Sequence, residues 1–225
     1  YGLLQFAEMK KVYPIDERLL PRTADWMMSQ LGDDGYFRVQ PRWGAVGANN
    51  HAYICWALTQ AGFTADDLGP ALDTLLAAAQ ASEDPYVTAL AALTFANIGH
   101  HEAFAEIAEM LAAMPLSVFF DGMAVNLDGE AAWTVQRSVV FEFTDIDQRY
   151  TYIVRRGASE LLDGALPEAD IHVRVDSQAF KEMLAGLRNP ALSLVRDFEV
   201  VKGGRIGFAR FMRLFQPDLD IDGTS

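Results

Sequence analysis

The histidines are the side chains in this sequence best suited to metal binding or proton transfer. His100 and His101 precede Glu102, and the three together could bind a metal, but we interpret them as the solvated start of a helix. His172 occupies an outward position in an alternating segment, where we expect it to be exposed. His51 follows two asparagines that suit a helix N-terminus, and for it we keep a ligand-binding role open.

The carboxylates form no familiar catalytic arrangement. Asp33 and Asp34 could act as an acid dyad, but a turn explains the pair better. The segment 218–222 resembles half of a calcium loop without its glycine and closing glutamate, and we interpret it as an acidic tail. The sequence has no glycine-rich phosphate loop and no nucleophile elbow. We therefore expect no catalytic residue, no metal and no cofactor, and a binding protein rather than an enzyme.

The net charge of −13 argues against nucleic acid as a partner, because phosphate contacts need clustered Lys and Arg. The same charge disfavours anionic membrane surfaces. No Lys or Arg occurs between Trp43 and Gln136. This acidic stretch is either a solvated surface that keeps the protein soluble or a face for a basic partner or cationic ligand.

Cys55 is the single cysteine, so the chain can form no internal disulfide and no cysteine-based zinc site. A cytoplasmic setting is the expectation that follows. No uninterrupted apolar run reaches the length of a membrane span. The sequence begins with Tyr1 inside a helix-like pattern, and we expect it to be a fragment of something longer.

The first half, residues 1–115, has the periodicity of helices joined by turns. Asp84-Pro85 marks one helix start, because Asp is a favourable N-cap and proline suits the first helical position. Similar signals predict helices over 23–30, 51–60, 71–80, 86–98 and 101–114. Ala57-Leu58-Thr59 recurs as Ala92-Leu93-Thr94, at an offset of 35 residues. Two helices in each repeat of this length predict stacked helical hairpins.

Parts of this half resemble the α/α-toroid superfamily of terpenoid cyclases, protein prenyltransferases and the thioester domain of alpha-2-macroglobulins. The stretches that carry the resemblance are 26–30 with 34–37, 53–62 and 84–93. The thioester motif, the cyclase Asp-x-Asp-Asp acid and the prenyltransferase zinc ligands are absent. The resemblance implies part of a toroid without its catalytic motifs, with a second candidate site at His51, Tyr53, Trp56, Asp84 and Tyr86.

Beyond Pro115 the apolar period changes to that of strands. Residues 139–143 and 150–154 alternate on either side of a loop at 145–148, and further strands are expected at 159–162, 171–175 and 199–202. They predict an antiparallel sheet with one face covered. Helices follow from caps at Asp176 and Asn189, and a last helix is expected over about 205–216.

Apolar stripes run along these later helices. Two of them have the i, i+3, i+4, i+7 spacing of one helical face, and a third comprises Leu194, Val195 and Phe198. Such stripes are either ordinary core or the wall of a pocket, and the excess of Phe and Met over Leu, Ile and Val favours the pocket. The candidate ligand-binding residues are Phe180, Met183, Leu184, Leu187, Leu194, Phe208, Phe211, Met212 and Phe215.

The order of elements over 116–220 resembles the sterol carrier protein family. The stretches that carry it are 139–145, 169–180, 185–191, 198–204 and 211–215. Alkylsulfatase-type hydrolases carry a similar C-terminal module. The resemblance implies a tunnel between sheet and helices that holds a lipid or another apolar molecule.

The predicted fold is multidomain, α and α+β. An array of α-helical hairpins, a partial toroid, covers 1–115, and a sterol-carrier-like antiparallel sheet under helices covers 116–225. The expected function is non-catalytic binding or carriage of a hydrophobic small molecule of lipid, sterol or fatty acyl type. The alternative is a protein-interaction or accessory module of a larger enzyme, whose acidic helical half docks a basic partner.

Overall fold

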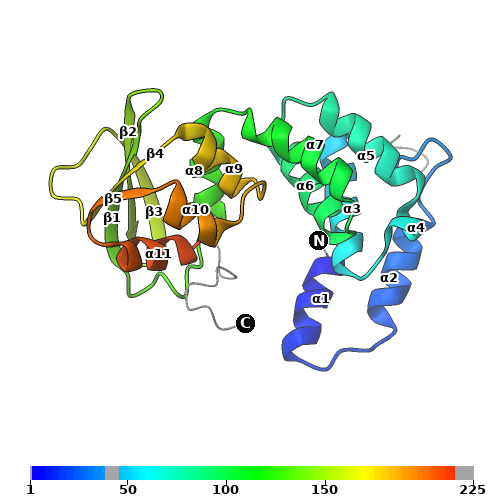
Figure 1. Cartoon of the computed structure of the whole chain (residues 1–225). Coiled ribbons are helices and arrows are strands. Elements are labelled where there is room, and N and C mark those ends of the chain that lie inside the picture. Colours follow the sequence, from blue (N-terminus) through cyan, green and yellow to red (C-terminus); the bar gives the residue numbers. More distant parts are fainter. Residues whose placement is uncertain (1, 39–45, 216–225) are drawn as a thin grey trace. The chain divides into compact units, whose positions relative to one another are not determined.

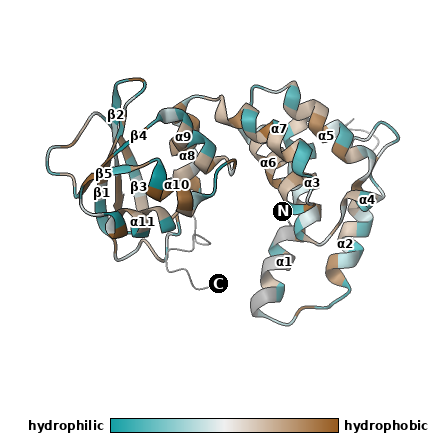
Figure 2. Ribbon diagram, viewed as in Figure 1, coloured by the Kyte–Doolittle hydropathy of each residue, from teal (hydrophilic) through white to brown (hydrophobic). Residues whose placement is uncertain are grey.

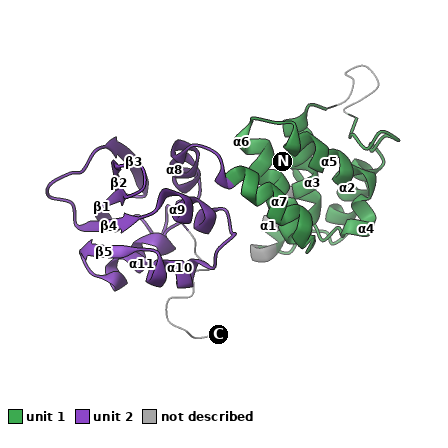
Figure 3. Cartoon of the chain, turned by 45° about the horizontal axis from the view of Figure 1, so that its top comes forward, with its two compact units in different colours: residues 1–111 green, residues 112–225 purple. Residues whose placement is uncertain are grey.

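The structure is a computed structural model that describes residues 2–38 and 46–215. It divides into two compact units, residues 1–111 and 112–225, close to the boundary expected after residue 115 (Figure 1; Figure 3). The acidic tail predicted at 218–222 and the expected end of the last helix at residue 216 lie outside the described residues.

Over its described residues, 2–38 and 46–111, the helices and strands assigned to the first unit are all helices, as the sequence predicts. Asp84 caps α6 by accepting a hydrogen bond from the N–H of Tyr86 at 2.9 Å, and Pro85 takes the first helical position. The helices are α1 (Gly2–Val12), α2 (Leu19–Met28), α3 (Ala48–Gln60), α4 (Ala65–Leu68), α5 (Pro70–Gln80), α6 (Pro85–Asn97) and α7 (His101–Ala112).

The helices α3 and α6 lie side by side and run parallel. At their N-terminal ends the Asn49 amide donates to the Asp84 carboxylate at 2.9 Å, and at their C-terminal ends the Asn97 amide donates to the Thr59 hydroxyl at 2.9 Å. These pairs are 35 and 38 residues apart in the sequence. The first separation equals the 35-residue repeat and the second exceeds it by three residues, so equivalent helices of successive hairpins pack against each other.

In its described residues, up to Phe215, the second unit has a five-stranded sheet and four helices. Its helices are α8 (Leu116–Val125), α9 (Ser177–Leu184), α10 (Pro190–Arg196) and α11 (Arg205–Arg213). Its strands are β1 (Gln136–Phe143), β2 (Gln148–Arg155), β3 (Ala158–Asp163), β4 (Ile171–Val175) and β5 (Glu199–Lys202), in the order β3-β2-β1-β4-β5.

The prediction of an antiparallel sheet is wrong at one position. The pairs β1–β2, β2–β3 and β4–β5 are antiparallel, but β1 and β4 are parallel, with Phe141 opposite Val173. Alternating apolar residues report which face of a strand is buried and carry no information on its neighbour's direction. The sheet is therefore mixed.

The parallel pair requires the segment 164–170 to pass from β3 across the sheet to β4. Thr151 on β2 is fully buried, and its hydroxyl donates to the Gly164 carbonyl at 2.7 Å and accepts from the Leu166 N–H at 2.9 Å. At the far end, the Asp170 carboxylate accepts from the N–H and the hydroxyl of Ser138 on β1 at 2.8 and 3.0 Å. These bonds hold the crossover on the sheet face opposite the aromatic side chains.

The helix α8 (Leu116–Val125) was not predicted from the sequence. Seven of the ten residues of this segment are apolar, and Pro115 occupies its N-cap position. A short apolar run without a clear period is compatible with either a helix or a buried strand, which is why its pattern was not decisive. Phe119, Phe120 and Met123 of α8 are buried.

In the part of the chain that the structure describes, no single helix is long and apolar enough to cross a membrane. The consecutive helices α7 and α8 reach that length and composition only when they are taken together.

Candidate hydrophobic-ligand site

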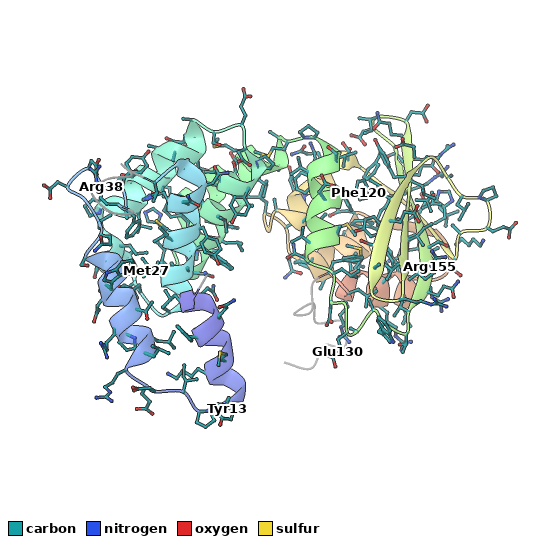
Figure 4. The ribbon with its side chains drawn as sticks, turned by 180° about the vertical axis from the view of Figure 1, so that it is seen from behind. Tyr13, Met27, Arg38, Phe120, Glu130 and Arg155 are labelled. Atoms are coloured by element: carbon teal, nitrogen blue, oxygen red, sulfur yellow. The ribbon has the colours of Figure 1, made fainter. Side chains whose placement is uncertain are left out.

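A cluster of aromatic rings occupies the space between the sheet and helices α8, α9 and α11. Phe120, labelled in Figure 4, lies on α8 beside the sheet. Its ring meets rings from the sheet and from α9. Its centroid lies 5.9 Å from that of Tyr152 in a stacked arrangement and 5.5 Å from that of Phe180. Its other ring partners are Phe141, Phe143 and Tyr150.

Two carboxylates position α9 over this cluster. Asp176 is the N-cap, and one of its oxygens accepts from the N–H groups of Gln178 and Ala179. Asp145, from the loop after β1, accepts from the N–H and the hydroxyl of Ser177. With the helix start fixed in this way, Phe180 and Met183 point into the unit and are 0% and 1% exposed.

The stripe on α11 closes the cluster from the other side. The ring centroid of Phe208 lies 6.1 Å from that of Phe141. The ring centroids of Phe211 and Phe215 lie 6.4 and 5.5 Å from that of Tyr152. Met212 is fully buried beside them. The structure therefore brings together six of the nine predicted residues: Phe180, Met183, Phe208, Phe211, Met212 and Phe215.

The other three predicted residues, Leu184, Leu187 and Leu194, have no place in the ring contacts described above. Leu184 and Leu187 are half-buried at the C-terminal end of α9 and in the turn that follows it. Leu194 of α10 is buried. Val195, which the third stripe was expected to bury, is 61% exposed, so that part of the stripe prediction is wrong. A helix as short as α10 has apolar residues on both sides, and only packing decides which side turns inward.

Several residues of the cluster were not among the candidates. Phe120 was missed with its helix, whereas Phe141, Phe143 and Tyr152 were recognised only as the inward face of strands. Phe198 was seen in the third stripe, and the structure places its ring 5.2 Å from Phe208 and 6.4 Å from Phe180. The inward alternation of the strands was the available signal for these residues.

A polar group on Tyr152 reaches the edge of the ring cluster. The Tyr152 hydroxyl donates to the Ser159 hydroxyl on β3 at 3.0 Å, while the Tyr152 ring is buried. Burial raises the pKa of the Tyr152 phenol above its ordinary value, so it stays protonated at neutral pH. Tyr152 and Ser159 thus provide hydrogen-bonding atoms beside the aromatic rings.

The rings in this cluster pack against one another, with centroid distances between 5.2 and 6.5 Å. Side chains that were expected to line a tunnel therefore contact each other directly. The open tunnel remains a prediction.

The second candidate site is divided between different surroundings. His51 is fully buried; its Nε2 donates to the Ala71 carbonyl at 3.0 Å, and its ring lies 5.0 Å from that of Tyr36. Burial lowers the pKa of His51, so the imidazole is neutral. Tyr53 and Trp56 contact each other on another face of α3, at 5.8 Å between centroids. A shared ligand-binding role for these residues remains a prediction.

Cys55 is buried one turn after His51, and its Sγ lies 3.7 Å from His51 Nε2. Burial raises the pKa of the Cys55 thiol to about 12, so it is not a thiolate nucleophile. Tyr86, another residue of the second candidate site, is 46% exposed at the start of α6, whereas His51 and Cys55 are buried.

The other side chains considered for chemistry have structural partners. His172 is part-buried, not exposed as expected, and its Nε2 lies 2.8 Å from Glu142 on the neighbouring strand. His100 Nδ1 accepts from the N–H of Ala103 in the first turn of α7. Among residues 2–38 and 46–215, no group of three or more His, Cys, Asp or Glu side chains could hold a metal ion.

In a comparison with known proteins, one family model matches mainly the second unit. Residues 105–218, more than half of the chain, match the family model described as alkyl sulfatase C-terminal. The chain belongs to the alkyl sulfatase C-terminal family. The expectation of a module similar to that of alkylsulfatase-type hydrolases is thereby confirmed.

The chain corresponds to a minor part of longer relatives. A linear primary-alkylsulfatase of Pseudomonas sp. (strain ATCC 19151) is 28% identical over 78 residues, which cover 35% of this chain and 15% of that protein. A double mutant of the sec-alkyl sulfatase PisA1 is similar at 15% identity over 87% of this chain and 31% of its own, with a TM-score of 0.42.

A conserved hypothetical protein of Thermus thermophilus, described as a possible sterol carrier protein, is similar at 20% identity. The likeness covers 44% of this chain and 79% of that one, with a TM-score of 0.33. These comparisons do not support the toroid resemblance of the first unit, which remains a prediction.

Proposed function

We propose that residues 112–225 bind an apolar small molecule of lipid, sterol or fatty acyl type as the accessory C-terminal module of a larger alkyl-sulfatase-type enzyme. The observation that carries the proposal is the continuous cluster of rings between sheet and helices, in a chain that belongs to this family. Binding of an aliphatic chain in such surroundings is driven by removal of its surface from water.

The ligand enters this interior by displacing flexible side chains. Met183 and Met212 are fully buried beside the rings, and methionine adapts its shape to new neighbours more readily than branched residues do. Half-buried Leu184 and Leu187 offer contacts that need no displacement. Tyr152 and Ser159 provide hydrogen bonds for a polar end of the ligand.

Fluorescence titration with cis-parinaric acid, together with native mass spectrometry of the purified chain, tests the proposal. We expect saturable binding of the probe and competition by unlabelled fatty acid. Phe211→Leu reshapes the proposed interior and should change the affinity severalfold. The same substitution at Phe95, a buried residue of the first unit, is the matched control and should leave it unchanged. Ligand-free protein that ignores fatty acids and sterols would contradict the proposal.

A second candidate function concerns the first unit. Glu102, Glu106 and Glu109 of α7 are exposed and follow one another at i, i+4 and i+7, which places them along one face. This acidic stripe favours the docking of a basic protein partner. A salt-sensitive pulldown distinguishes the two functions, because apolar ligand binding should barely respond to salt.

A further inference from the structure

The helices α10 and α11 expose large apolar side chains on the outside of the second unit. Leu192 and Val195 of α10 are 57% and 61% exposed, and Ile206 of α11 is 68% exposed. Leu192 and Val195 share one side of α10 because they are three residues apart. The guanidinium of Arg205 donates to the Val195 carbonyl at 3.1 Å, which joins the end of α10 to the start of α11.

Basic side chains lie among these apolar ones. Arg196 is four residues after Leu192 on α10, and Arg210 is four residues after Ile206 on α11; both are exposed, as is Arg205. No carboxylate of the described residues forms an ion pair with Arg196, Arg205 or Arg210. We call Leu192, Val195, Arg196, Arg205, Ile206 and Arg210 the α10–α11 face.

The α10–α11 face differs in charge from the rest of the chain. Residues 188–213 contain six of the 18 Lys and Arg residues but only two of the 31 Asp and Glu residues. The net charge of −13 therefore comes from elsewhere in the sequence. The mixture of hydrophilic and hydrophobic residues along both helices is visible in Figure 2. The acidic net charge of the chain therefore does not exclude an anionic surface as a partner for this face.

Single exposed apolar residues are common on proteins and need no explanation. Three bulky aliphatic side chains next to three arginines are a different pattern. The aliphatic groups can insert into an apolar layer, and the arginines can attract anionic groups at the same place. An anionic lipid surface satisfies both, with its headgroups near the arginines and its acyl boundary near the aliphatic groups. An acidic protein would match the arginines but has no general need for the aliphatic groups.

We propose that the α10–α11 face docks the protein on an anionic lipid surface. Arg196 and Arg210 contact the headgroups, and Val195 and Ile206 insert between them. The proposal goes beyond ligand binding in the interior and does not depend on it. It places the module where an apolar molecule with an anionic headgroup would be concentrated.

Sedimentation of the full chain with vesicles tests this docking. We expect binding to vesicles of phosphatidylglycerol mixed with phosphatidylcholine and much weaker binding to phosphatidylcholine alone. Val195→Ser and Ile206→Ser should each weaken the partition coefficient by about tenfold, the effect of losing one inserted aliphatic side chain. Arg196→Gln and Arg210→Gln should each weaken it by about fivefold. Arg205 is left unchanged because it holds the Val195 carbonyl.

Matched controls use exposed residues of the same unit on other elements. Ile146→Ser, in the loop between β1 and β2, and Arg155→Gln, at the end of β2, should leave vesicle binding unchanged. Equal losses in the controls, or wild-type binding without preference for phosphatidylglycerol, would overturn the proposal. So would self-association in analytical ultracentrifugation that the same face substitutions abolish, because the face would then be covered by a second copy.

Titration with cis-parinaric acid in the absence of vesicles separates this proposal from the proposed function. The face variants should bind the probe as the wild type does. Wild-type protein that binds vesicles through this face but not the probe would leave docking intact and reject ligand binding. Probe binding without vesicle binding would do the reverse.

Discussion

Asp145 and Ser177, 32 residues apart, join the β1–β2 loop to the first residue of α9. The Ser177 N–H and hydroxyl both donate to the Asp145 carboxylate, at 2.7 and 2.5 Å. The start of α9 is thus set by a residue of the sheet as well as by its own cap, Asp176. Since α9 carries Phe180 and Met183 into the ring cluster, this pair of hydrogen bonds positions one wall of the candidate site.

The hydrogen bonds between Asp145 and Ser177 should stabilise the second unit. Ser177→Ala removes the hydroxyl donor and should destabilise the second unit by about 1–2 kcal/mol in urea unfolding. Asp145→Asn keeps one acceptor oxygen and should cost less than Asp145→Ala. If both Asp145 variants are as stable as the wild type, the carboxylate contributes nothing through these bonds.

The same pair predicts a response to acid. Partial burial acts to raise the pKa of Asp145, but the hydrogen bonds from Ser177 outweigh it, and the pKa is lowered. A lowered native pKa means that this stabilisation is present above the unfolded value of about 3.9 and is lost as the pH falls through the native value. Urea midpoints of wild type and Asp145→Asn should therefore converge towards low pH.

Phe120 should be the most sensitive position of α8. Phe120→Ala removes the ring that touches five others and should cost about 3–5 kcal/mol, measured by urea unfolding of the second unit. Phe120→Leu keeps an apolar side chain and should cost clearly less. Equal, small losses in both variants would show that the ring is not packed as described.

The turn before α11 offers a matched pair of glycines. Gly203 and Gly204 both have positive φ, 89° and 73°, so alanine at either should cost about 1–2 kcal/mol for backbone strain. A Cβ at Gly203 would also lie 2.6 Å from the Asp170 carbonyl oxygen, whereas at Gly204 it would meet nothing within 4 Å. Gly203→Ala should therefore lower the melting temperature more than Gly204→Ala; the opposite order would contradict this turn geometry.

His51 should make the stability of the first unit depend on pH. Burial lowers its native pKa below the ordinary value of about 6.5, so between these two values the unfolded chain binds a proton that the native state lacks. The free energy of unfolding of the first unit is then highest above about pH 6.5. It falls as the pH decreases below this value, until the native imidazole is also protonated. No partner for His51 Nδ1 was found among the described residues, which is consistent with a neutral ring.

The measurement compares urea midpoints of the first unit at about pH 7.5 and about pH 5.5. His51→Gln retains an N–H that can donate to the Ala71 carbonyl and has no proton to gain. It should remove most of the difference between the two midpoints. An unchanged difference would assign the acid sensitivity to another group.

The sequence by itself determined the elements whose signals are local. Asp84-Pro85 and Asn189-Pro190 start helices where caps and proline geometry predict them, and Gly203-Gly204 turns the chain between β5 and α11. The apolar spacing on α9 and α11 likewise identified Phe180, Met183, Phe208 and Met212 as inward residues. Each of these signals depends on residues within one or two turns of each other.

Tertiary structure alone decided how those elements meet. The parallel pairing of β1 with β4 depends on the crossover that Thr151 and Asp170 hold, and no strand period encodes it. The ring of Phe120 became central because α8 packs beside the sheet. Val195 faces outward because α10 has apolar residues on both sides, and the sheet can bury only one of them. Local patterns predict which face of a segment can be buried. The packing of the whole unit determines which element covers that face.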